Sequence, residues 1–394
     1  VLFDLPAGAA LATAHEMSRQ RSYGADVLSR IAYANQNGHL AVGAPLVGQL
    51  GDMLRQTLTQ AAQKAESVQR LVITGNTTML HFLTGLDPRG IGAAPFTPQS
   101  LFGDSRPAQA LFPFLPPEAE LYLPPCVSAY IGADITCGIL STDLCRRQET
   151  GLLVDVGTNG EMALYADGLL LCCAAAAGPA FEGAEIRMGM SAAAGAIDKL
   201  WATEKGAIEW RVIGGGPPAG LCGTGLISAA ALLLRQGIMD GGGRLQTAGH
   251  PYTEYLSRRD GQIVFQLGDS GVLLTQRDIR NLQLAKAAIR AGLETLLPDA
   301  GKTAADIRRL YLAGGFGSFL DPGEAAQIGL IPTALGSKTT AVGNAALTGA
   351  ARLLFSQSAR DEAGRLAAQA REISLTTSQV FMSRYIEQMS FRDE

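Results

Sequence analysis

The stretch that most constrains this chain is residues 151–162, Gly-Leu-Leu-Val-Asp-Val-Gly-Thr-Asn-Gly-Glu-Met. An apolar run at 152–154 leads into Asp155, and a second apolar run continues through Met162 to Tyr165. We therefore predict a strand, a tight glycine turn and a return strand. Such a turn gathers main-chain N–H groups that can bind anionic oxygens, and an acidic side chain at a strand end can hold Mg²⁺ through water. The alternative interpretation is an ordinary hairpin that binds nothing.

Length and composition exclude several classes of protein. The 394 residues predict two domains or lobes, and a net charge of −4 gives no support for binding to nucleic acid or to an anionic membrane. The six cysteines and four histidines show no metal-binding spacing, so we expect reduced thiols in a cytoplasmic protein and histidines at the surface or in satisfied core positions. The longest apolar run, residues 169–181, is shorter than the roughly 20 residues of a membrane span.

Hydrophobic periodicity predicts a mixed chain of helices and strands. Strands are predicted at two places within 1–17, and at 71–73, 152–154, 162–165, 263–274, 309–313 and near 373. Helices are predicted at 21–36, 43–68, from 79, at 128–142, in the later part of 183–201, at 226–234, 275–296 and 343–355, and around an apolar stripe of Phe381, Met382, Tyr385 and Met389.

Three segments carry further expectations. Thr275 is predicted to be the N-cap of its long helix. The nine prolines within residues 84–127 predict a long surface connection with short strands. The small residues of 128–142 predict a helix that packs closely, suited to connect two lobes.

Four glycine-bearing turns follow or open a regular element. They are Thr74–Thr77, Asp155–Glu161, Cys222–Gly225 and Gly314–Gly317. None has the Gly-Lys-Ser/Thr of a Walker A loop, and none is a dinucleotide-binding G-x-G-x-x-G. Their order resembles the acetate kinase–sugar kinase–heat-shock–actin (ASKHA) nucleotide-binding fold. The resemblance implies an actin-like α/β ATPase of two related lobes that close on ATP.

Five sequence strings sharpen this resemblance across the whole chain. They are Thr-Gly-Asn-Thr-Thr-Met (74–79), Asp-Val-Gly-Thr-Asn-Gly-Glu (155–161), Gly-Pro-Ala-Phe-Glu-Gly-Ala-Glu-Ile (178–186), Gln-Leu-Ala-Lys-Ala-Ala-Ile (283–289) and Leu-Ala-Gly-Gly-Phe-Gly (312–317). Together they resemble the ATP-dependent reductive activators of corrinoid proteins. The resemblance implies an ATPase that helps to reduce Co(II) corrinoid to Co(I) on a methyltransferase partner, with the electron supplied by a 2Fe-2S cluster.

The resemblance also implies roles for individual residues. Asp155 would orient Mg²⁺ and serve catalysis with Glu182 and Asn76; Glu182 is otherwise a surface carboxylate, and Asn76 otherwise a helix N-cap. The residues implied to bind the nucleotide are Thr77 near the γ-phosphate, Gly157, Thr158, Asn159 and Gly160 on phosphates, Gly223, Thr224 and Gly225 at a helix N-terminus, Lys286, and Gly314, Gly315 and Gly317 against adenosine. The alternative for Lys286 is an exposed charge, and the alternative for the last three glycines is a plain loop.

Two parts of the family pattern are missing from the sequence. The first phosphate hairpin is expected just upstream of Val1, and the 2Fe-2S cluster is expected only in a preceding N-terminal part. We therefore expect residues 1–137 to form a first lobe without that hairpin. Residues 138–394 are expected to form the second lobe, with C-terminal helices returning toward the first. The resemblance further implies a homodimer.

Two other functions stay open at this point. A small-molecule kinase of the same fold, acting on a sugar or acyl substrate, would place an acceptor pocket in the first lobe. A non-enzymatic, actin-like switch would use nucleotide only to change shape. A cluster-binding cysteine pattern upstream of Val1 would favour the redox function over both.

Overall fold

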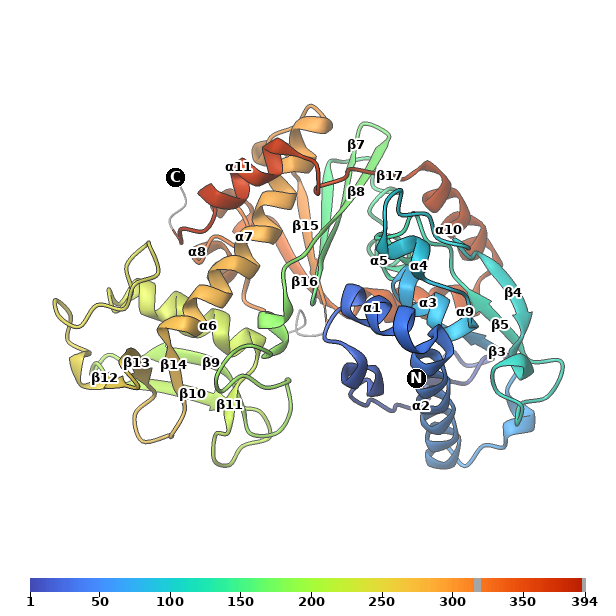
Figure 1. Ribbon diagram of the computed structural model, residues 1–394, viewed down its shortest axis with the longest axis horizontal. Helices are drawn as coiled ribbons and strands as arrows, with labels where there is room; N and C mark the ends of the chain where they lie inside the picture. The colour runs from blue at the N-terminus through green and yellow to red at the C-terminus, as the bar shows by residue number, and fades with distance from the viewer. Residues whose placement is uncertain (315–319, 392–394) are drawn as a thin grey trace. The chain divides into compact units, whose positions relative to one another are not determined.

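The structure is a computed structural model that describes residues 1–314 and 320–391, and the chain divides into two compact units (Figure 1). One unit comprises Val1–Asp143 and Ala345–Glu372, and the other comprises Leu144–Asn344 and Ile373–Glu394. The division follows Asp143 rather than residue 137, because helix α5 (Ala133–Thr142) continues past the expected boundary. Among the described helices, none combines the length and apolar character that crossing a membrane requires.

The first unit combines short strands with helices around one apolar core. Its strands are β1 (Leu2–Phe3), β2 (Ala10–Ala12), β3 (Arg70–Val72), β4 (Asp104–Pro107), β5 (Glu120–Leu123) and β17 (Arg371–Glu372). Its α-helices are α1 (Val27–Asn37), α2 (His39–Gln60), α3 (Thr77–Thr84), α4 (Arg89–Gly92), α5, α9 (Ala345–Phe355) and α10 (Gln357–Gln369). β1 and β2 form an antiparallel pair, and a second sheet has the order β3-β5-β4.

The proline-rich segment 84–127 is not simply a surface connection, so that expectation is wrong in part. Its strand β5 lies between β3 and β4 in the sheet, and Leu121 and Leu123 are fully buried. The prolines bound this strand without entering it. The high proline frequency of this segment therefore does not indicate that it contains a short apolar strand in the core.

Helices α5 and α9 approach each other closely, as the small residues of 128–142 predict. A Cβ added to Gly349 on α9 would lie only 2.0 Å from the carbonyl oxygen of Cys137 on α5. Arg352 closes the far end of this contact by donating to the carboxylate of Asp143 at 2.9 Å. The expected helix at 128–142 begins later, at Ala133, because Gly132 has an extended backbone.

The second unit contains a larger sheet, two smaller sheets and the most deeply buried helices. Its strands are β6 (Gly151–Val156), β7 (Gly160–Ala166), β8 (Leu169–Ala175), β9 (Ala196–Ala202), β10 (Ile208–Val212), β11 (Gly220–Leu221), β12 (Leu256–Arg259), β13 (Gln262–Gln266), β14 (Leu273–Thr275), β15 (Arg309–Ala313) and β16 (Thr339–Gly343). Its α-helices are α6 (Gly223–Arg235), α7 (Gln276–Asp299), α8 (Pro322–Gln327) and α11 (Gln379–Glu387).

The larger sheet of this unit runs β16-β15-β6-β7-β8, with β6 parallel to β15 and antiparallel to β7. This confirms the strand, turn and return strand predicted at 151–162. Helix α7 packs against β7 and β8, and its N-terminus is capped as predicted. The Thr275 hydroxyl accepts from the N–H of Asp278 at 3.1 Å, and the Asp278 carboxylate accepts from the N–H of Thr275 at 2.8 Å.

The helix expected in the later part of 183–201 is wrong, because residues 196–202 form the central strand β9 of the sheet β10-β9-β11. Alanine content suggested a helix. The glycines instead fold the preceding segment back on itself, since a Cβ on Gly189 would lie 2.0 Å from the carbonyl oxygen of Gly183. After that turn the first three residues of β9 are all buried, and only its later part alternates, with Lys199 and Trp201 more exposed than Leu200 between them.

The cysteines and histidines show no metal site in the described residues. None of the six cysteines, all of which are described, forms a disulfide, and no group of three or more His, Cys, Asp or Glu side chains in that part of the chain could hold a metal ion. His81 is a satisfied core residue, since its Nδ1 contacts the carbonyl of Thr77 at 2.7 Å and its Nε2 accepts from the N–H of Gln99 at 3.1 Å. Burial lowers the pKa of His81, so the ring is neutral there.

The contact between α5 and α9 yields a stability prediction. Gly349→Ala places a methyl group against the Cys137 carbonyl, so we expect the free energy of unfolding to fall by about 2–4 kcal/mol. Gly364→Ala on α10 is the matched control, because nothing lies within 4 Å of its added Cβ. There we expect a gain of about 1 kcal/mol from helix propensity. Thermal unfolding of both variants measures the difference, and equal midpoints would show that the close contact is absent.

Candidate functional site

The turn between β6 and β7 consists of residues 157–159, because Val156 pairs with Gly160 across the hairpin. The N–H of Gly157 donates to the carbonyl of Asn159 at 2.9 Å, which holds the turn closed. Glycine is required at 160, since a Cβ there would lie 2.6 Å from the Cγ1 of Ile289 on α7. Helix α7 therefore packs directly against the end of the turn.

Glu182 lies beside this turn. The hydroxyl of Thr158 donates to the Oε1 of Glu182 at 2.6 Å. Glu182 ends a short 3₁₀ helix, Pro179–Glu182, which packs against both α6 and α7. The exposed Glu182 side chain is thus a surface carboxylate that is also fixed to the turn, so the two interpretations offered for it do not exclude each other.

The end of β15 meets the end of β6 at the edge of the sheet. Ala313 at the end of β15 pairs in parallel register with Asp155, so both strands end at the same point. Gly314 follows with φ +126, and a Cβ on it would lie 2.2 Å from the carbonyl oxygen of Val156. Only glycine allows this approach of two main chains. Gly315 and Gly317 lie outside the described residues.

The third glycine turn opens helix α6. Its N-cap residue, Cys222, makes no side-chain capping hydrogen bond, so the first N–H groups of the helix receive no side-chain acceptor from the cap. Gly225 is held close to β9, because a Cβ there would lie 2.0 Å from the carbonyl oxygen of Ile197. Thr224 is buried, and its hydroxyl lies 3.2 Å from the Sγ of Cys222. A helix N-terminus without a side-chain cap suits an anionic oxygen.

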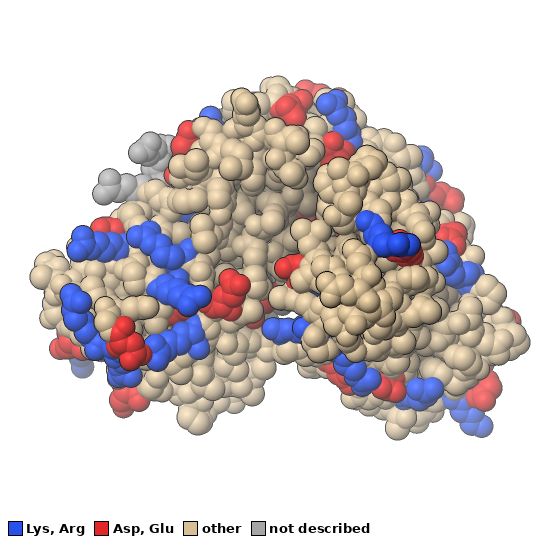
Figure 2. Space-filling view, in the orientation of Figure 1, with Lys and Arg blue, Asp and Glu red and all other residues tan. Residues whose placement is uncertain are grey.

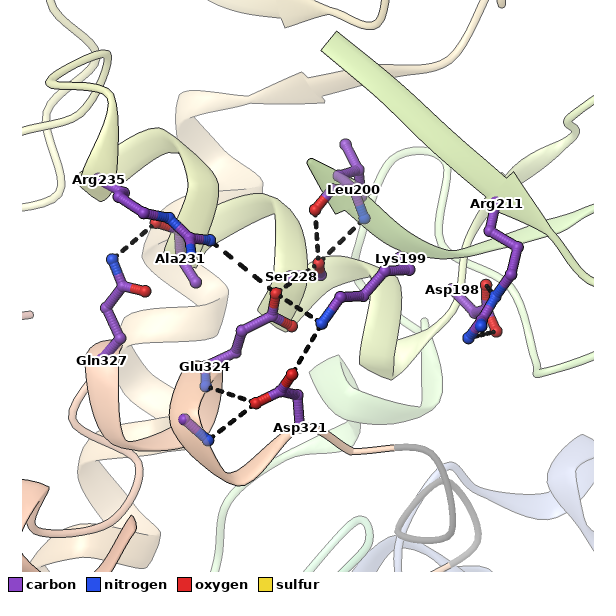
Figure 3. A network of polar contacts seen from close by, with 11 residues as sticks. Asp198, Lys199, Leu200, Arg211, Ser228, Ala231, Arg235, Asp321, Glu324 and Gln327 are labelled. Atoms are coloured by element: carbon purple, nitrogen blue, oxygen red, sulfur yellow. Dashed lines mark hydrogen bonds and ion pairs between the residues drawn. The ribbon is translucent and has the colours of Figure 1, made fainter. Parts of the chain in front are cut away.

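A polar network that the sequence did not reveal fastens the segment after Gly314–Gly317 to β9 and α6 (Figure 3). The Nζ of Lys199 on β9 donates to Asp321 at 2.8 Å and to Glu324 at 3.0 Å. Ser228 on α6 donates to the same Glu324 carboxylate at 3.1 Å. Asp321 also caps α8 by accepting from the N–H of Gly323 at 2.9 Å. These contacts link residues far apart in sequence, and no local pattern signals them.

The charges of this network stabilise one another. Burial alone would lower the pKa of Lys199, but its hydrogen bonds to Asp321 and Glu324 leave that pKa raised. The same hydrogen bond from Lys199 lowers the pKa of Asp321. Lys199 and Asp321 are therefore charged at neutral pH, and the loop end at Asp321 is held by charge-assisted hydrogen bonds.

In the first unit, Asn76 and Thr77 have structural partners. The Asn76 side chain accepts from the N–H of Met79 at 2.9 Å, so the N-cap interpretation is correct for it. The buried Thr77 hydroxyl donates to the carbonyl of Ser128 at 2.6 Å. These bonds fix the turn at the start of α3, and a role near a phosphate stays a prediction.

Asp134, which the sequence analysis did not single out, lies against the same turn. A Cβ on Gly132 would be 2.7 Å from the Oδ1 of Asp134 and 2.4 Å from the Cα of Asn76, so the two segments are in tight contact. Burial raises the pKa of Asp134 to about 6. A carboxyl group with such a pKa can accept a proton near neutral pH. An isolated acidic residue in the small, apolar stretch 132–140 was the only signal available for it.

Lys286 is buried in α7, so the alternative of an exposed charge is wrong. Its Nζ donates to the carbonyl of Ser390 and lies 5.5 Å from the centre of the Phe391 ring. The carbonyl preceding it in this segment, that of Met389, accepts from Gln283 one turn earlier on α7 at 2.6 Å. Lys286 therefore joins the C-terminal segment to α7, and contact with a nucleotide stays a prediction.

The chain is similar to known protein families over nearly its whole length. The family model described as the C-terminal domain of RACo, the ASKHA domain, matches residues 149–394, and the model described as the RACo middle region matches residues 1–147. The chain is 32% identical over 411 residues to a protein of Eubacterium limosum named corrinoid activation enzyme RamQ, covering 100% of this chain and 68% of that protein.

Two further relatives carry related names. The chain is 27% identical over 404 residues to a Methanosarcina barkeri protein named Co(II) methylated amine-specific corrinoid protein reductase, covering 93% of this chain and 70% of that one. A solved structure named reductive activator for corrinoid, iron-sulfur protein matches with a TM-score of 0.90 and 35% identity, covering 98% of this chain and 63% of that chain. The chain therefore spans less than two thirds of this solved relative.

The network around Lys199 yields the prediction of this section. Lys199→Met leaves Glu324, which is 9% exposed, without its nearest cation, so we expect the free energy of unfolding to fall by about 1–3 kcal/mol. Adding Glu324→Gln should recover part of the loss, because a neutral amide needs no counter-ion. Lys205→Met, at an exposed lysine, is the control and should change stability by less than about 0.5 kcal/mol. Losses that simply add in the double variant would disprove the coupling.

Proposed function

Since the chain belongs to the RACo family and has its ASKHA fold, we propose that it is the ATP-binding and ATP-hydrolysing module of a reductive activator. In this proposal the activator returns an inactive Co(II) corrinoid to Co(I) on a methyltransferase partner. The observation that carries it is the close contact at one sheet edge between the end of β15 and the end of β6, where Gly314 contacts Val156 beside Asp155.

The residues at this edge would bind the nucleotide mainly through the main chain. The N–H groups of the turn 157–159 and of the first turn of α6 would contact phosphate oxygens. Gly314 and the turn that it opens would lie against the adenosine. Phosphoryl transfer to water depends mostly on position and charge neutralisation, which such a site supplies without covalent chemistry.

The donor groups of this edge fit Mg²⁺ with bound ATP. Mg²⁺ keeps several of its waters and commonly takes one or two carboxylates together with phosphate oxygens. Asp155 supplies a carboxylate at the strand end, and Glu182 supplies a second one that is fixed through Thr158. In the presence of Mg²⁺, these carboxylates would orient its water shell toward the phosphates.

The first unit offers support for the expected first phosphate strand. A cavity of about 410 Å³ is lined on one side by Val1–Leu5 and on the other by Gln69–Ile73. These segments contain β1 and β3, which belong to separate sheets. We infer that a strand preceding Val1 in a longer polypeptide fills this cavity and joins the two sheets, which would bring the first phosphate hairpin to the first unit.

The electron carrier is proposed to lie in such a preceding part as well. The described residues contain no cluster of metal-binding side chains, so no 2Fe-2S site fits them. The names of the relatives refer to activation or reduction of corrinoid proteins, which supports the redox function over a small-molecule kinase or an actin-like switch. We further propose the homodimer that the family resemblance implies.

Asp134 is our candidate for the general base in this proposal. Its raised pKa and the tight packing of Gly132, two residues before it, against Asn76 support the assignment. A base of this kind accepts a proton from the attacking water when it is ionised. It would therefore operate above its pKa of about 6 and would lose activity below it.

Nucleotide titration tests the proposed site. The chain, extended at its N-terminus by the first phosphate hairpin of a relative, should bind Mg·ATP, and Asp155→Ala should weaken binding by about 10–100-fold with the circular dichroism spectrum unchanged. Asp167→Ala, whose carboxylate is 75% exposed in the turn between β7 and β8, is the control and should bind normally. Unchanged affinity in Asp155→Ala would overturn the site. ATP-dependent formation of Co(I), followed by absorbance with a Co(II)-loaded corrinoid protein, then tests the coupled function.

The pH dependence of ATP hydrolysis tests Asp134. We expect the rate to rise as the pH passes upward through about 6, and Asp134→Asn to lower it by about 10²-fold and abolish this rise. Stability should respond in the opposite sense. The folded pKa of Asp134 lies above the ordinary value of an aspartate, so the stability that protonated Asp134 contributes is lost as the pH rises through about 6. The asparagine variant should therefore be at least as stable as the wild type at pH 8. An unchanged pH–rate profile would exclude Asp134 as the base.

A further inference from the structure

Four arginines of the second unit surround one recess on its surface. The recess encloses about 620 Å³, and its lining includes the four side chains Arg244, Arg258, Arg277 and Arg280. All four residues are exposed. In Figure 2, Lys and Arg side chains gather over the part of this unit that carries β12, β13 and the start of α7. This arginine recess is positively charged, whereas the chain as a whole has a net charge of −4.

Within the described residues, none of the four arginines forms an ion pair with a carboxylate. The neighbouring carboxylates are engaged elsewhere. Asp278 is buried and accepts from the N–H groups of Thr275 and Arg187, while Asp260 lies 3.6 Å from Arg187. Asp240 accepts from a backbone N–H and from the side chain of Gln246. The positive charge of the recess is therefore not neutralised by the described part of the unit.

The scaffold holds the arginine recess in place. Arg258 lies on β12, in register with Ile263 of β13. Arg280 is fixed by hydrogen bonds from its Nη1 to the carbonyl of Gly242 at 3.0 Å and to the side chain of Gln283 at 2.5 Å. Gln276, at the start of α7, ties the helix to the segment that carries Arg244 by donating to the carbonyl of Gly243 at 2.6 Å.

One of the arginines lies where a helix disfavours a cation. Arg277 is in the first turn of α7, where the positive end of the helix dipole repels positive charge. Such a placement costs stability in the isolated chain. An anionic partner would remove that cost on binding.

We propose that the arginine recess is the docking surface for an acidic face of a partner protein. Exposed guanidinium groups remain hydrated, so a single ion pair with a small anion in water is weak. A protein surface rich in Asp and Glu would engage several guanidinium groups at once and remove water from them, which gives both affinity and rapid association. Resting on the proposed function, the partner is the corrinoid protein itself, which must bind in each cycle of reduction and leave afterwards.

Charge reversal tests the proposal on the N-terminally extended protein. In Arg258→Glu/Arg277→Glu, we expect the KM for the Co(II) corrinoid protein to rise at least about tenfold, while kcat and the affinity for Mg·ATP stay unchanged. The wild-type KM should also rise between about 50 and about 200 mM NaCl. Lys64→Glu/Arg365→Glu, which makes the same change in charge at exposed residues of the first unit, is the control and should leave the KM within about twofold. Equal effects of the two double variants would overturn the docking surface.

A second measurement separates this proposal from the proposed function. Poly-L-glutamate should bind the wild-type protein and the control variant, and the Arg258→Glu/Arg277→Glu protein at least about tenfold more weakly. If no Co(I) forms with the wild type, the proposed function fails, yet this measurement still decides whether the recess binds an acidic chain. Stoichiometric binding of inorganic tripolyphosphate, lost in Arg258→Glu/Arg277→Glu, would identify a small-anion site and overturn the assignment to a protein partner.

Discussion

The parallel pairing of β6 with β15 is the interaction on which the candidate site depends. It aligns Asp155 with Ala313, so that both strands end at one edge and the residues that follow must share the same space. Gly314 then touches the carbonyl of Val156, an approach that a single methyl group would prevent. The ends of the two strands are thus fixed to each other through the main chain. Because hydrogen bonds of a parallel ladder tolerate little slippage when both faces are covered, the helices that bury this sheet also hold the register of the site.

Glycine contributes to this fold chiefly by what it lacks. At Gly160 a side chain would strike α7, at Gly225 it would strike β9, and at Gly349 it would strike α5. Each glycine costs conformational entropy on folding, roughly 0.5–1 kcal/mol more than alanine in a regular element. That cost is offset where helix and strand backbones pack closely enough for dispersion contacts and for main-chain groups to reach a ligand. The abundance of glycine and the scarcity of aromatic residues therefore have one cause, because elements whose backbones pack closely leave no room for large side chains between them.

Local chemistry explains which features could be predicted from the sequence. Residues that are neighbours in the chain specify three of the features: the hairpin at 151–162, the cap at Thr275 and the strand ending at Ala313. These features can therefore be predicted from local sequence patterns. Strand β9 was misread because alanine and glycine fit a helix as readily as a turn followed by a strand. The link from Lys199 to Asp321 joins residues 122 positions apart, and the raised pKa of Asp134 comes from burial by distant segments. Such properties arise only when the chain has folded, and no window of sequence contains them.

In these proposals the main chain binds the nucleotide, and surface side chains recognise the protein partner. The proposed nucleotide contacts use N–H groups that every residue but proline carries, together with glycines that admit a close approach. Such contacts survive extensive replacement of side chains, in keeping with a TM-score of 0.90 at 35% identity to the solved relative. Recognition of a particular protein partner cannot rely on groups that all relatives share, since it requires a difference in affinity between partners. It must come from side chains at the surface, and the uncompensated guanidinium groups around the arginine recess have the charge and the fixed geometry to supply it.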